Sequence, residues 1–173
     1  MRQTSFAAMQ CSLARSLEVV GDWWSPLVLR DLFLGLDRFD QLVDDLGISR
    51  NLLADRLAKL VEGGVVAREA YQERPVRHRY LLTDAGRELV PVLLALTAWG
   101  DRWMTPDGGP PLLVAHVGCG ARTTPTVCCS ACGEPLRSDD VAVSAGPGGR
   151  SAPGTALLEG VLGPRPGAGT MDA

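Results

Sequence analysis

The sequence predicts a mainly α-helical fold with a small β-hairpin wing, the arrangement of a winged helix-turn-helix, plus a small C-terminal zinc-ribbon-like β appendage. Three observations carry this prediction. Two short amphipathic segments meet at the turn GIS, residues 47–49. Two segments rich in β-branched and aromatic residues follow at 65–71 and 77–82. After the last helical segment, two short motifs of potential metal ligands lie between His116 and Cys132.

An α-helix is predicted over 27–34. Ser25 and Pro26 precede it, and a serine N-cap followed by proline at the first helical position is a common helix start, because the missing proline N–H would have no partner there. Trp23 and Trp24 come just before this start. We expect them to pack in the core rather than to form a ligand cage, since aromatic side chains mostly serve burial.

The next two helices flank the GIS turn. In 39–46 the apolar residues follow the i, i+3, i+4, i+7 pattern of a short helix, and Gly47 suits the position just after its end. Ser49 is a favourable N-cap for a helix that runs to Glu62, where two glycines stop it. Two short helices joined in this way have the form of a helix-turn-helix, whose second helix enters the major groove of DNA.

The helix after Ser49 has two distinct faces. Leucines at helical spacing form a narrow buried stripe, and the opposite face begins with short side chains that can lie close to a groove. We expect contacts with base edges from Arg50, Asn51, Ala54 and Asp55. Arg56 and Lys59 are expected to reach the DNA backbone, and Ser49 lies at the same end of the helix. For this segment taken alone, an ordinary solvated helix is the alternative.

The segments 65–71 and 77–82 predict two strands joined by the loop 72–76, whose proline suits a loop better than a strand. The loop and the second strand carry basic side chains that can straddle phosphates beside the groove. These are Arg74, Arg77, His78 and Arg79. A run of charge is usually a solvated face, but after a helix-turn-helix it favours a DNA-binding wing.

Thr83 is expected to cap a long final helix. The apolar residues of this helix form a stripe too wide for one small domain. They are Leu89, Val92, Leu93, Leu96, Trp99 and Trp103. Pro91 inside the helix should bend it. We therefore expect the chain to form a homodimer along this helix.

Charge is unevenly distributed along the chain, although the formal total is only −3. Residues 1–46 hold four basic and seven acidic side chains, whereas residues 47–80 hold seven basic and four acidic ones. The local potential at a contact surface matters more to a polyanion than net charge, because ordinary salt screens charges beyond roughly 10 Å. We expect moderate DNA affinity with a distinct salt dependence.

Four motifs occur in a characteristic order and spacing. A cysteine opens the first helix, Gly-x-x-Trp precedes the second, Arg-Phe precedes the third, and Tyr-x-Leu-Thr-x-x-Gly enters the last. Over about 8–105 the chain thereby resembles the HxlR-type winged-helix transcription regulators. The resemblance implies a bacterial cytoplasmic regulator with a DNA-binding and dimerisation domain at 1–105. It also implies binding to double-stranded DNA at an inverted-repeat operator, as a homodimer paired through the first and last helices.

The composition suits one main domain of ordinary size with a small appendage, since 46% of the 173 residues are hydrophobic. The N-terminus lacks the regions of a signal peptide, and the run VPVLLAL at 90–96 is too short to span a bilayer. We therefore expect a cytoplasmic protein with no membrane partner. Thiols stay reduced in that compartment, so clustered cysteines suggest metal or redox chemistry before disulfides.

The cysteine cluster after the last helix predicts a structural Zn²⁺ site within a module at 111–145. HVGCG and CSACG share the form ligand-x-x-Cys-Gly, and two such turns supply the four soft ligands of tetrahedral zinc. The expected ligands are His116, Cys119, Cys129 and Cys132. Cys128 is an alternative to Cys129 as a ligand. A redox pair formed by Cys129 and Cys132, or uninvolved thiols, are the other interpretations.

Cys11 stands apart from this cluster. In the resembling family, a cysteine near the start of the first helix serves several members as a redox or electrophile sensor, and Cys11 falls in that position. Ser-Leu follows it where a proline often sits. The dipole at a helix N-terminus favours a thiolate, but a free cysteine is also a common buried filler. Both interpretations stay open.

The remaining C-terminal sequence predicts only short strands and a disordered tail. The runs at 111–117 and 139–145 are expected to be the strands of the zinc-ribbon-like module. From 146 to 173 the chain is rich in Gly, Pro, Ala and Ser without apolar periodicity, which predicts a disordered tail with at most a brief helical turn around 156–162.

Two other function classes are compatible with the cysteine cluster. They are a thiol oxidoreductase that acts through Cys129 and Cys132, and a zinc-dependent protein-binding adaptor. The sequence holds no Gly-rich phosphate loop and no Ser-His-Asp set, and only two histidines. It therefore favours a sequence-specific transcriptional regulator over an enzyme.

Overall fold

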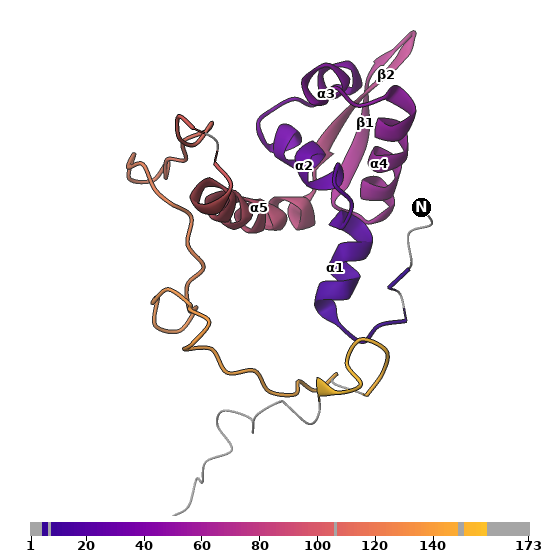
Figure 1. Cartoon of the computed structure of the whole chain (residues 1–173). Coiled ribbons are helices and arrows are strands. Elements are labelled where there is room, and N and C mark those ends of the chain that lie inside the picture. The colour runs from indigo at the N-terminus through magenta and orange to yellow at the C-terminus, as the bar shows by residue number, and fades with distance from the viewer. Residues whose placement is uncertain (1–4, 7, 106, 149–150, 159–173) are drawn as a thin grey trace, which may run out of the picture. The chain divides into compact units, whose positions relative to one another are not determined.

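The computed structural model describes residues 5–6, 8–105, 107–148 and 151–158 of the 173-residue chain. The described residues form α1 (Ser12–Val20), α2 (Ser25–Phe33), α3 (Phe39–Leu46), α4 (Arg50–Glu62), β1 (Val66–Glu73), β2 (Val76–Leu82) and α5 (Asp84–Trp103) (Figure 1). The chain divides into two compact units, one of Asp22–Pro135 and one of Met1–Gly21 with Leu136–Ala173. No helix in the described part is long and apolar enough to cross a membrane.

The core of the Asp22–Pro135 unit lies among α2, α3, α4 and the start of β1. Apolar side chains with at most 8% exposure fill it: Val28, Leu29, Leu32, Leu42, Ile48, Leu53, Leu57, Leu60, Val65 and Val66. Burial of one leucine side chain contributes roughly 1.5 to 3 kcal/mol. The three buried leucines of α4 therefore fix which face of that helix meets solvent, and the predicted buried stripe is confirmed.

The predicted helix-turn-helix is formed by α3 and α4, with the ends that the sequence indicates. Gly47 ends α3 in the left-handed region at φ 61°, where glycine has no steric penalty. The Ser49 hydroxyl accepts the N–H of Leu52 at 3.4 Å and caps α4. At the other end, Gly64 adopts φ +72° and lets the Val65 N–H donate to the Leu60 carbonyl at 3.1 Å.

The start of α2 differs from the prediction. Trp24 is the N-cap residue, and Ser25 and Pro26 are the first two helical residues. The Asp22 carboxylate accepts the backbone N–H groups of Trp24 and Ser25 at 2.8 and 3.0 Å, so an acidic side chain replaces the expected serine cap. The expectation that both tryptophans pack in the core is also wrong, because Trp23 is 90% exposed.

The wing is a two-stranded antiparallel hairpin of β1 and β2 that extends beyond α3 and α4 (Figure 1). The strands are longer than the sequence predicts, so that only Arg74 and Pro75 remain at the turn in place of a loop over 72–76. The proline lies at the tip, where no ladder hydrogen bond is lost. A register shift between Ala70 and Gln72 marks a β-bulge at Tyr71.

α5 begins against the base of this hairpin. The Thr83 hydroxyl accepts the Gly86 N–H at 3.2 Å, which confirms the predicted cap, and donates to the Gly64 carbonyl at 2.7 Å. A Cβ at Gly86 would overlap the carbonyl oxygen of Val65, so glycine allows the close approach of α5 to β1. The helix continues as one element through Pro91.

After α5 the described residues form no strand, and the expected strands at 111–117 and 139–145 are absent. Two isolated antiparallel bridges, Ala115 with Arg122 and Cys128 with Pro135, close two short turns instead. Turns are also present at 147–148 and within 151–158, and the other parts of the predicted disordered tail, 149–150 and 159–173, lie outside the described residues.

Candidate nucleic-acid interface

The solvent face of α4 carries the residues expected to contact DNA bases. Asn51, Ala54, Asp55 and Lys59 are all exposed. They lie opposite the buried leucine stripe, and none forms an ion pair within the described residues. The first turns of α4 therefore present a slender polar surface to solvent.

Arg50 at the start of α4 is exposed but engaged. Its Nη1 lies 2.8 Å from the Asp40 carboxylate, and its guanidinium lies 5.0 Å from the centroid of the Phe39 ring. Both partners belong to the start of α3. The contacts hold Arg50 against α3, and a phosphate or a base would compete with Asp40 for it.

Arg56 does not point outward with the other basic residues of α4. Its side chain is 19% exposed and its Nη1 lies 3.5 Å from the Asp22 carboxylate at the start of α2. Its Nε and Nη1 are buried without a hydrogen-bond partner among the described residues. The expected contact of Arg56 with the DNA backbone is therefore not available in this conformation, because the guanidinium lies on the protein side of the helix.

The charge of Asp22 is stabilised in this position. Burial raises the pKa of the Asp22 carboxyl, but hydrogen bonds from Ser25 and the Trp24 N–H, with the nearby positive charge of Arg56, outweigh burial and lower it. The carboxylate is thus ionised over the whole neutral range. It can hold the start of α2 and the middle of α4 at the same time.

The arginines of the hairpin differ in whether they form an ion pair. Arg79 pairs with Glu69 on the facing strand at 3.0 Å. Arg74 at the turn and Arg77 beside it are exposed and have no carboxylate within 4.0 Å among the residues that the structure describes. Arg74 and Arg77 are thus the tip residues that are ready for an anion, while Arg79 is partly neutralised.

Two further basic residues lie beside this surface and were not singled out from the sequence. The backbone of Arg38 forms an isolated antiparallel β-bridge with Arg79 of β2. The Arg38 guanidinium lies 6.0 Å from the Tyr71 ring centroid. Arg68 of β1 is exposed and its Nη2 lies 3.0 Å from Nδ1 of His78. The Arg-Phe motif before α3 was noted only as a family feature, and the cross-strand register was needed to place it next to the wing.

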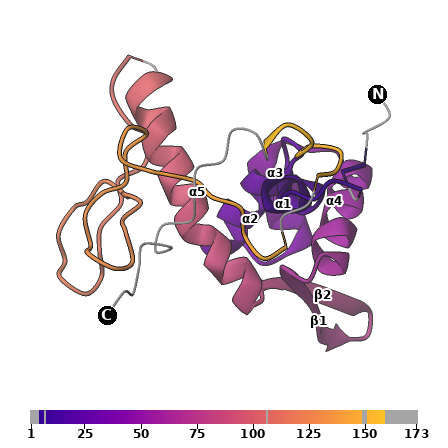
Figure 2. The ribbon, with the colours of Figure 1, turned by 90° about the horizontal axis from the view of Figure 1, so that it is seen from below.

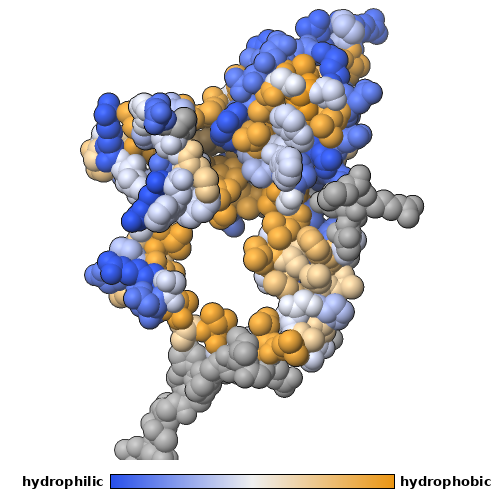
Figure 3. Space-filling view, viewed as in Figure 1, coloured by the Kyte–Doolittle hydropathy of each residue, from blue (hydrophilic) through white to orange (hydrophobic). Residues whose placement is uncertain are grey.

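Hydrophilic and hydrophobic residues gather on different parts of the surface of this unit. Hydrophilic residues gather over the hairpin and the helices next to it, and hydrophobic residues gather where α2 and α5 lie (Figure 3). Of the seven basic residues in 47–80, three form ion pairs, and four have no carboxylate within 4.0 Å in the part of the chain that the structure describes: Lys59, Arg68, Arg74 and Arg77. The anion-binding capacity is therefore centred on the hairpin and one side of α4.

A separate apolar surface is formed by α2 and α5. Phe33, Leu96, Trp99 and Trp103 are each at least half exposed, and an apolar groove of about 160 Å³ lies between the two helices. The predicted stripe of α5 is thus present and largely uncovered in the single chain. α5 reaches away from α3 and α4 (Figure 2), which leaves this surface accessible.

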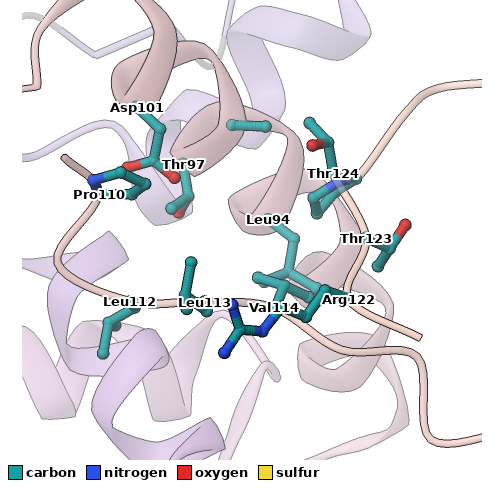
Figure 4. A pocket seen from close by; sticks show the side chains of 12 residues that line it. Leu94, Thr97, Asp101, Pro110, Leu112, Leu113, Val114, Arg122, Thr123 and Thr124 are labelled. Carbon is teal, nitrogen blue, oxygen red and sulfur yellow. The ribbon is translucent and has the colours of Figure 1, made fainter. Parts of the chain in front are cut away.

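The segment after α5 lies beside the C-terminal half of that helix (Figure 2). A cavity of about 270 Å³ separates the two, and Leu94 and Asp101 line it from α5 while Leu113 and Arg122 line it from the segment (Figure 4). The lining mixes leucine and valine side chains with threonines. Val114 and Arg122, which flank the first of the two ligand-bearing turns, belong to this lining.

The four expected zinc ligands form two pairs. Nδ1 of His116 lies 3.3 Å from Sγ of Cys119. In the second turn, backbone N–H groups of Cys132 and Ala131 and the Cys132 thiol face Cys129 and lower its pKa. Among the described residues, no three His, Cys, Asp or Glu side chains are grouped closely enough to hold a metal ion.

Cys11 lies at the N-cap of α1 in the other unit. It is partly exposed, its sulfur makes no cap hydrogen bond, and its carbonyl accepts the Arg15 N–H at 3.0 Å. The predicted position at the beginning of the first helix is therefore correct.

Known proteins are similar to this chain in sequence and in fold. The family model for the HxlR-like helix-turn-helix matches residues 19–108. The HTH-type transcriptional regulator Rv3095 of Mycobacterium tuberculosis is 42% identical over 137 residues, which cover 79% of this chain and 87% of the relative. This match is longer than 1–105, so it continues into the C-terminal part.

Solved structures agree with the sequence matches. The crystal structure of PA1607, described as a candidate transcription factor, is 36% identical with a TM-score of 0.73, and the match covers 83% of this chain and 100% of that chain. The redox regulator HypR in its oxidized form is 29% identical with a TM-score of 0.51, over 56% of this chain and 100% of that chain. With a family model that spans more than half of its residues and a relative covered over most of its length, the chain belongs to the HxlR-like helix-turn-helix family.

Proposed function

We propose that this protein is a transcriptional regulator that binds an inverted-repeat DNA operator as a homodimer. The observation that carries the proposal is the exposed face of α4, with Asn51 and Ala54 in its first two turns. Beside it lies a hairpin whose Arg74 and Arg77 have no carboxylate partner among the described residues. The names of relatives such as Rv3095 support it, since these are HTH-type transcriptional regulators.

In the proposed complex, the first two turns of α4 enter the major groove. Asn51 can donate to and accept from an adenine edge, and the Ala54 methyl can contact a thymine methyl. Asp55 can accept from a cytosine amino group. Arg50 reaches a base or a phosphate by exchanging its contact with Asp40 for a stronger charge-assisted one.

The DNA backbone is held by a second set of residues. Lys59 lies on the exposed side of α4, and Arg74 and Arg77 lie at the tip of the wing. These contacts position the protein without reading sequence, and each adds to the salt dependence of binding. Arg79 contributes after it releases Glu69. Arg56 has a different role, which is to fix α4 on α2 through Asp22.

The homodimer is proposed to form through α5 and the helix α1. The exposed apolar groove between α2 and α5, with Trp99 and Trp103 along α5, supports this part of the proposal. Half-exposed tryptophans contribute strongly to protein interfaces when a partner covers them. A symmetric pair would present two copies of α4 to two half-sites of an inverted repeat.

A redox response through Cys11 is part of the same proposal. Its support is the partly exposed thiol at the start of α1, together with the similarity to HypR, which is a redox regulator. Oxidation would join the Cys11 sulfur to a second thiol in a disulfide, and the oxidant would accept the two electrons and two protons. The alternative is that Cys11 is a packing residue with no redox role.

The test uses the full-length chain and labelled DNA fragments from upstream of its own gene and of the adjacent genes. We expect one fragment to be retarded in the presence of excess unrelated DNA, and footprinting of that fragment to protect two halves of an inverted repeat. Equal affinity for every fragment would contradict sequence-specific binding.

The assembly is tested by sedimentation of the same protein. We expect two chains per particle at micromolar concentration, and Trp99→Asp should give single chains with weak operator binding, because a carboxylate would be buried in the interface. Val143→Asp is the matched control, since it changes a valine that is 63% exposed and lies outside α5. Dimers of the Trp99 variant would show that the partner surface lies elsewhere.

A further inference from the structure

The two turns that follow α5 have the same backbone hydrogen bonds. In the first, the Gly120 N–H donates to the His116 carbonyl at 2.8 Å, and the His116 N–H donates to the Ala121 carbonyl at 2.9 Å. In the second, the Gly133 N–H donates to the Cys129 carbonyl at 2.8 Å, and the Cys129 N–H donates to Glu134 at 2.8 Å. Each glycine has a positive φ, at 68° and 79°.

The match continues on both sides of the turns. Ala115 bridges to Arg122, and Cys128 bridges to Pro135. In each case the bridged pair consists of the residue before the first ligand and the residue two positions after the glycine. The superposition of the two patterns makes Cys129 the counterpart of His116 and makes Cys128 the counterpart of Ala115. This equivalence separates the two neighbouring cysteines, which spacing alone leaves ambiguous.

The donor atoms in the first turn lie 3.3 Å apart, slightly closer than two ligands of one zinc ion. Tetrahedral Zn²⁺, with bonds of about 2.3 Å to sulfur and about 2.05 Å to nitrogen, places two such ligands about 3.6 Å apart. Nδ1 of His116 and Sγ of Cys119 are 3.3 Å apart. Both side chains are exposed, so an ion can reach them from solvent.

In each turn, the residue just before the second ligand suits the size of the first ligand's side chain. A Cβ at Gly118 would lie 2.9 Å from Cε1 of His116, so glycine leaves room for the imidazole ring. The corresponding residue of the second turn is Ala131, beside the smaller cysteine.

We propose that the two turns bind one structural Zn²⁺ ion through His116, Cys119, Cys129 and Cys132. Each turn alone offers two ligands, and the described residues contain no group of three, so a complete site needs both turns on the same ion. Eight residues, 121–128, separate the turns and allow them to meet. A redox role for Cys129 and Cys132 would use only the second turn and would leave the matching first turn without a purpose.

The test measures metal in the full-length chain purified without chelators and after addition of ZnSO₄. Native mass spectrometry and elemental analysis should give about one zinc per chain. Replacement of zinc by Co²⁺ should give the visible absorption of a tetrahedral site with a thiolate-to-cobalt charge-transfer band. Cys119→Ser and Cys132→Ser should each lose most of the zinc and change the cobalt spectrum.

Cys128→Ser is the matched control, because Cys128 is the exposed thiol next to the proposed ligand. It should keep its zinc, whereas Cys129→Ser should lose it. The opposite result for these two variants would overturn the ligand assignment. Folded wild-type chain that stays free of zinc, a ratio of one zinc per two chains, or a disulfide between Cys129 and Cys132 in the protein as purified would each overturn the site itself.

Discussion

Nη1 of Arg56 lies 3.5 Å from Oδ2 of Asp22, and this contact joins the middle of α4 to the start of α2. The same carboxylate accepts the N–H groups of Trp24 and Ser25. One acidic side chain thus fixes the first turn of α2 and holds an arginine of the candidate DNA-reading helix on its protein side. The orientation of α4 therefore depends on an acidic residue outside the helix-turn-helix.

Asp22→Ala should lower the free energy of unfolding by about 2 to 3 kcal/mol, because it removes a helix cap and leaves the partly buried Arg56 without its charge partner. Urea unfolding followed by circular dichroism measures this loss. Asp40→Ala is the control, since it breaks the exposed pair with Arg50, and exposed pairs contribute about 0 to 1 kcal/mol. Equal losses in both variants would contradict the structural role of the Asp22 contact.

Asp22 and Asp31 should change the stability of the fold in opposite directions as the pH falls. The pKa of Asp22 is lowered in the folded chain because its hydrogen bonds and Arg56 outweigh burial. Its contribution is complete above the usual value of 3.8 and is lost as the pH falls through the lowered folded pKa. The stability difference between wild type and Asp22→Asn should therefore stay constant down to about pH 3.8 and shrink as the pH falls below that value.

Asp31 should behave in the opposite way. Burial raises the pKa of its carboxyl above 3.8, in spite of the hydrogen bond and charge of Arg30. The folded chain then takes up a proton more readily than the unfolded chain, so wild type gains stability relative to Asp31→Asn as the pH falls through the raised folded pKa. Urea midpoints of the three proteins over an acid pH series check both slopes, and slopes of the same sign would refute the assignment.

Local chemistry explains why the helix-turn-helix was predictable. Ser49, Gly47 and Thr83 act within one turn of their own positions, so capping rules locate these helix ends without knowledge of the fold. The buried stripe of α4 was predictable for the same reason, because its period depends only on the helix. These features fix the elements that carry the proposed contacts with DNA.

The features that local sequence patterns did not reveal depend on distant partners. Arg56 faces Asp22, and no pattern within α4 reveals that contact. Trp23 is exposed although tryptophan usually favours burial, because no element of the Asp22–Pro135 unit covers it. Ser25 lost its capping role because Asp22 reaches the same N–H groups from three residues earlier. The register of the hairpin likewise set the neighbours of Arg79.

Asn51→Ala and Arg77→Ala should weaken DNA binding in different ways. The amide of Asn51 is proposed to read a base, so its loss should cost about 1 to 3 kcal/mol mainly on the cognate operator. Arg77 is proposed to hold a phosphate, so its loss should weaken binding on all sequences and reduce the salt slope by about 1. Fluorescence anisotropy on operator and scrambled DNA over a salt series separates the two.

Arg137→Ala is the control for this pair, because it removes an exposed arginine that lies outside the proposed interface. It should leave both affinity and salt slope near the wild-type values. Identical behaviour of the Asn51 and Arg77 variants would show that the division between base reading and backbone contact is wrong.

Cys11→Ser should abolish any effect of diamide on operator binding. Diamide removes two electrons and two protons from a pair of thiols, so a response through Cys11 requires a new disulfide at its sulfur. The sulfur is partly exposed at the start of α1 and makes no cap hydrogen bond, so an oxidant can reach it without unfolding the helix.

Cys128→Ser is the matched control, since it removes an exposed cysteine outside the four proposed zinc ligands. Anisotropy with and without diamide, with peptide mapping of the disulfide, measures the effect. A response that persists in Cys11→Ser but disappears in Cys128→Ser would move the sensor to the C-terminal cysteines, and no response in wild type would leave Cys11 as a packing residue.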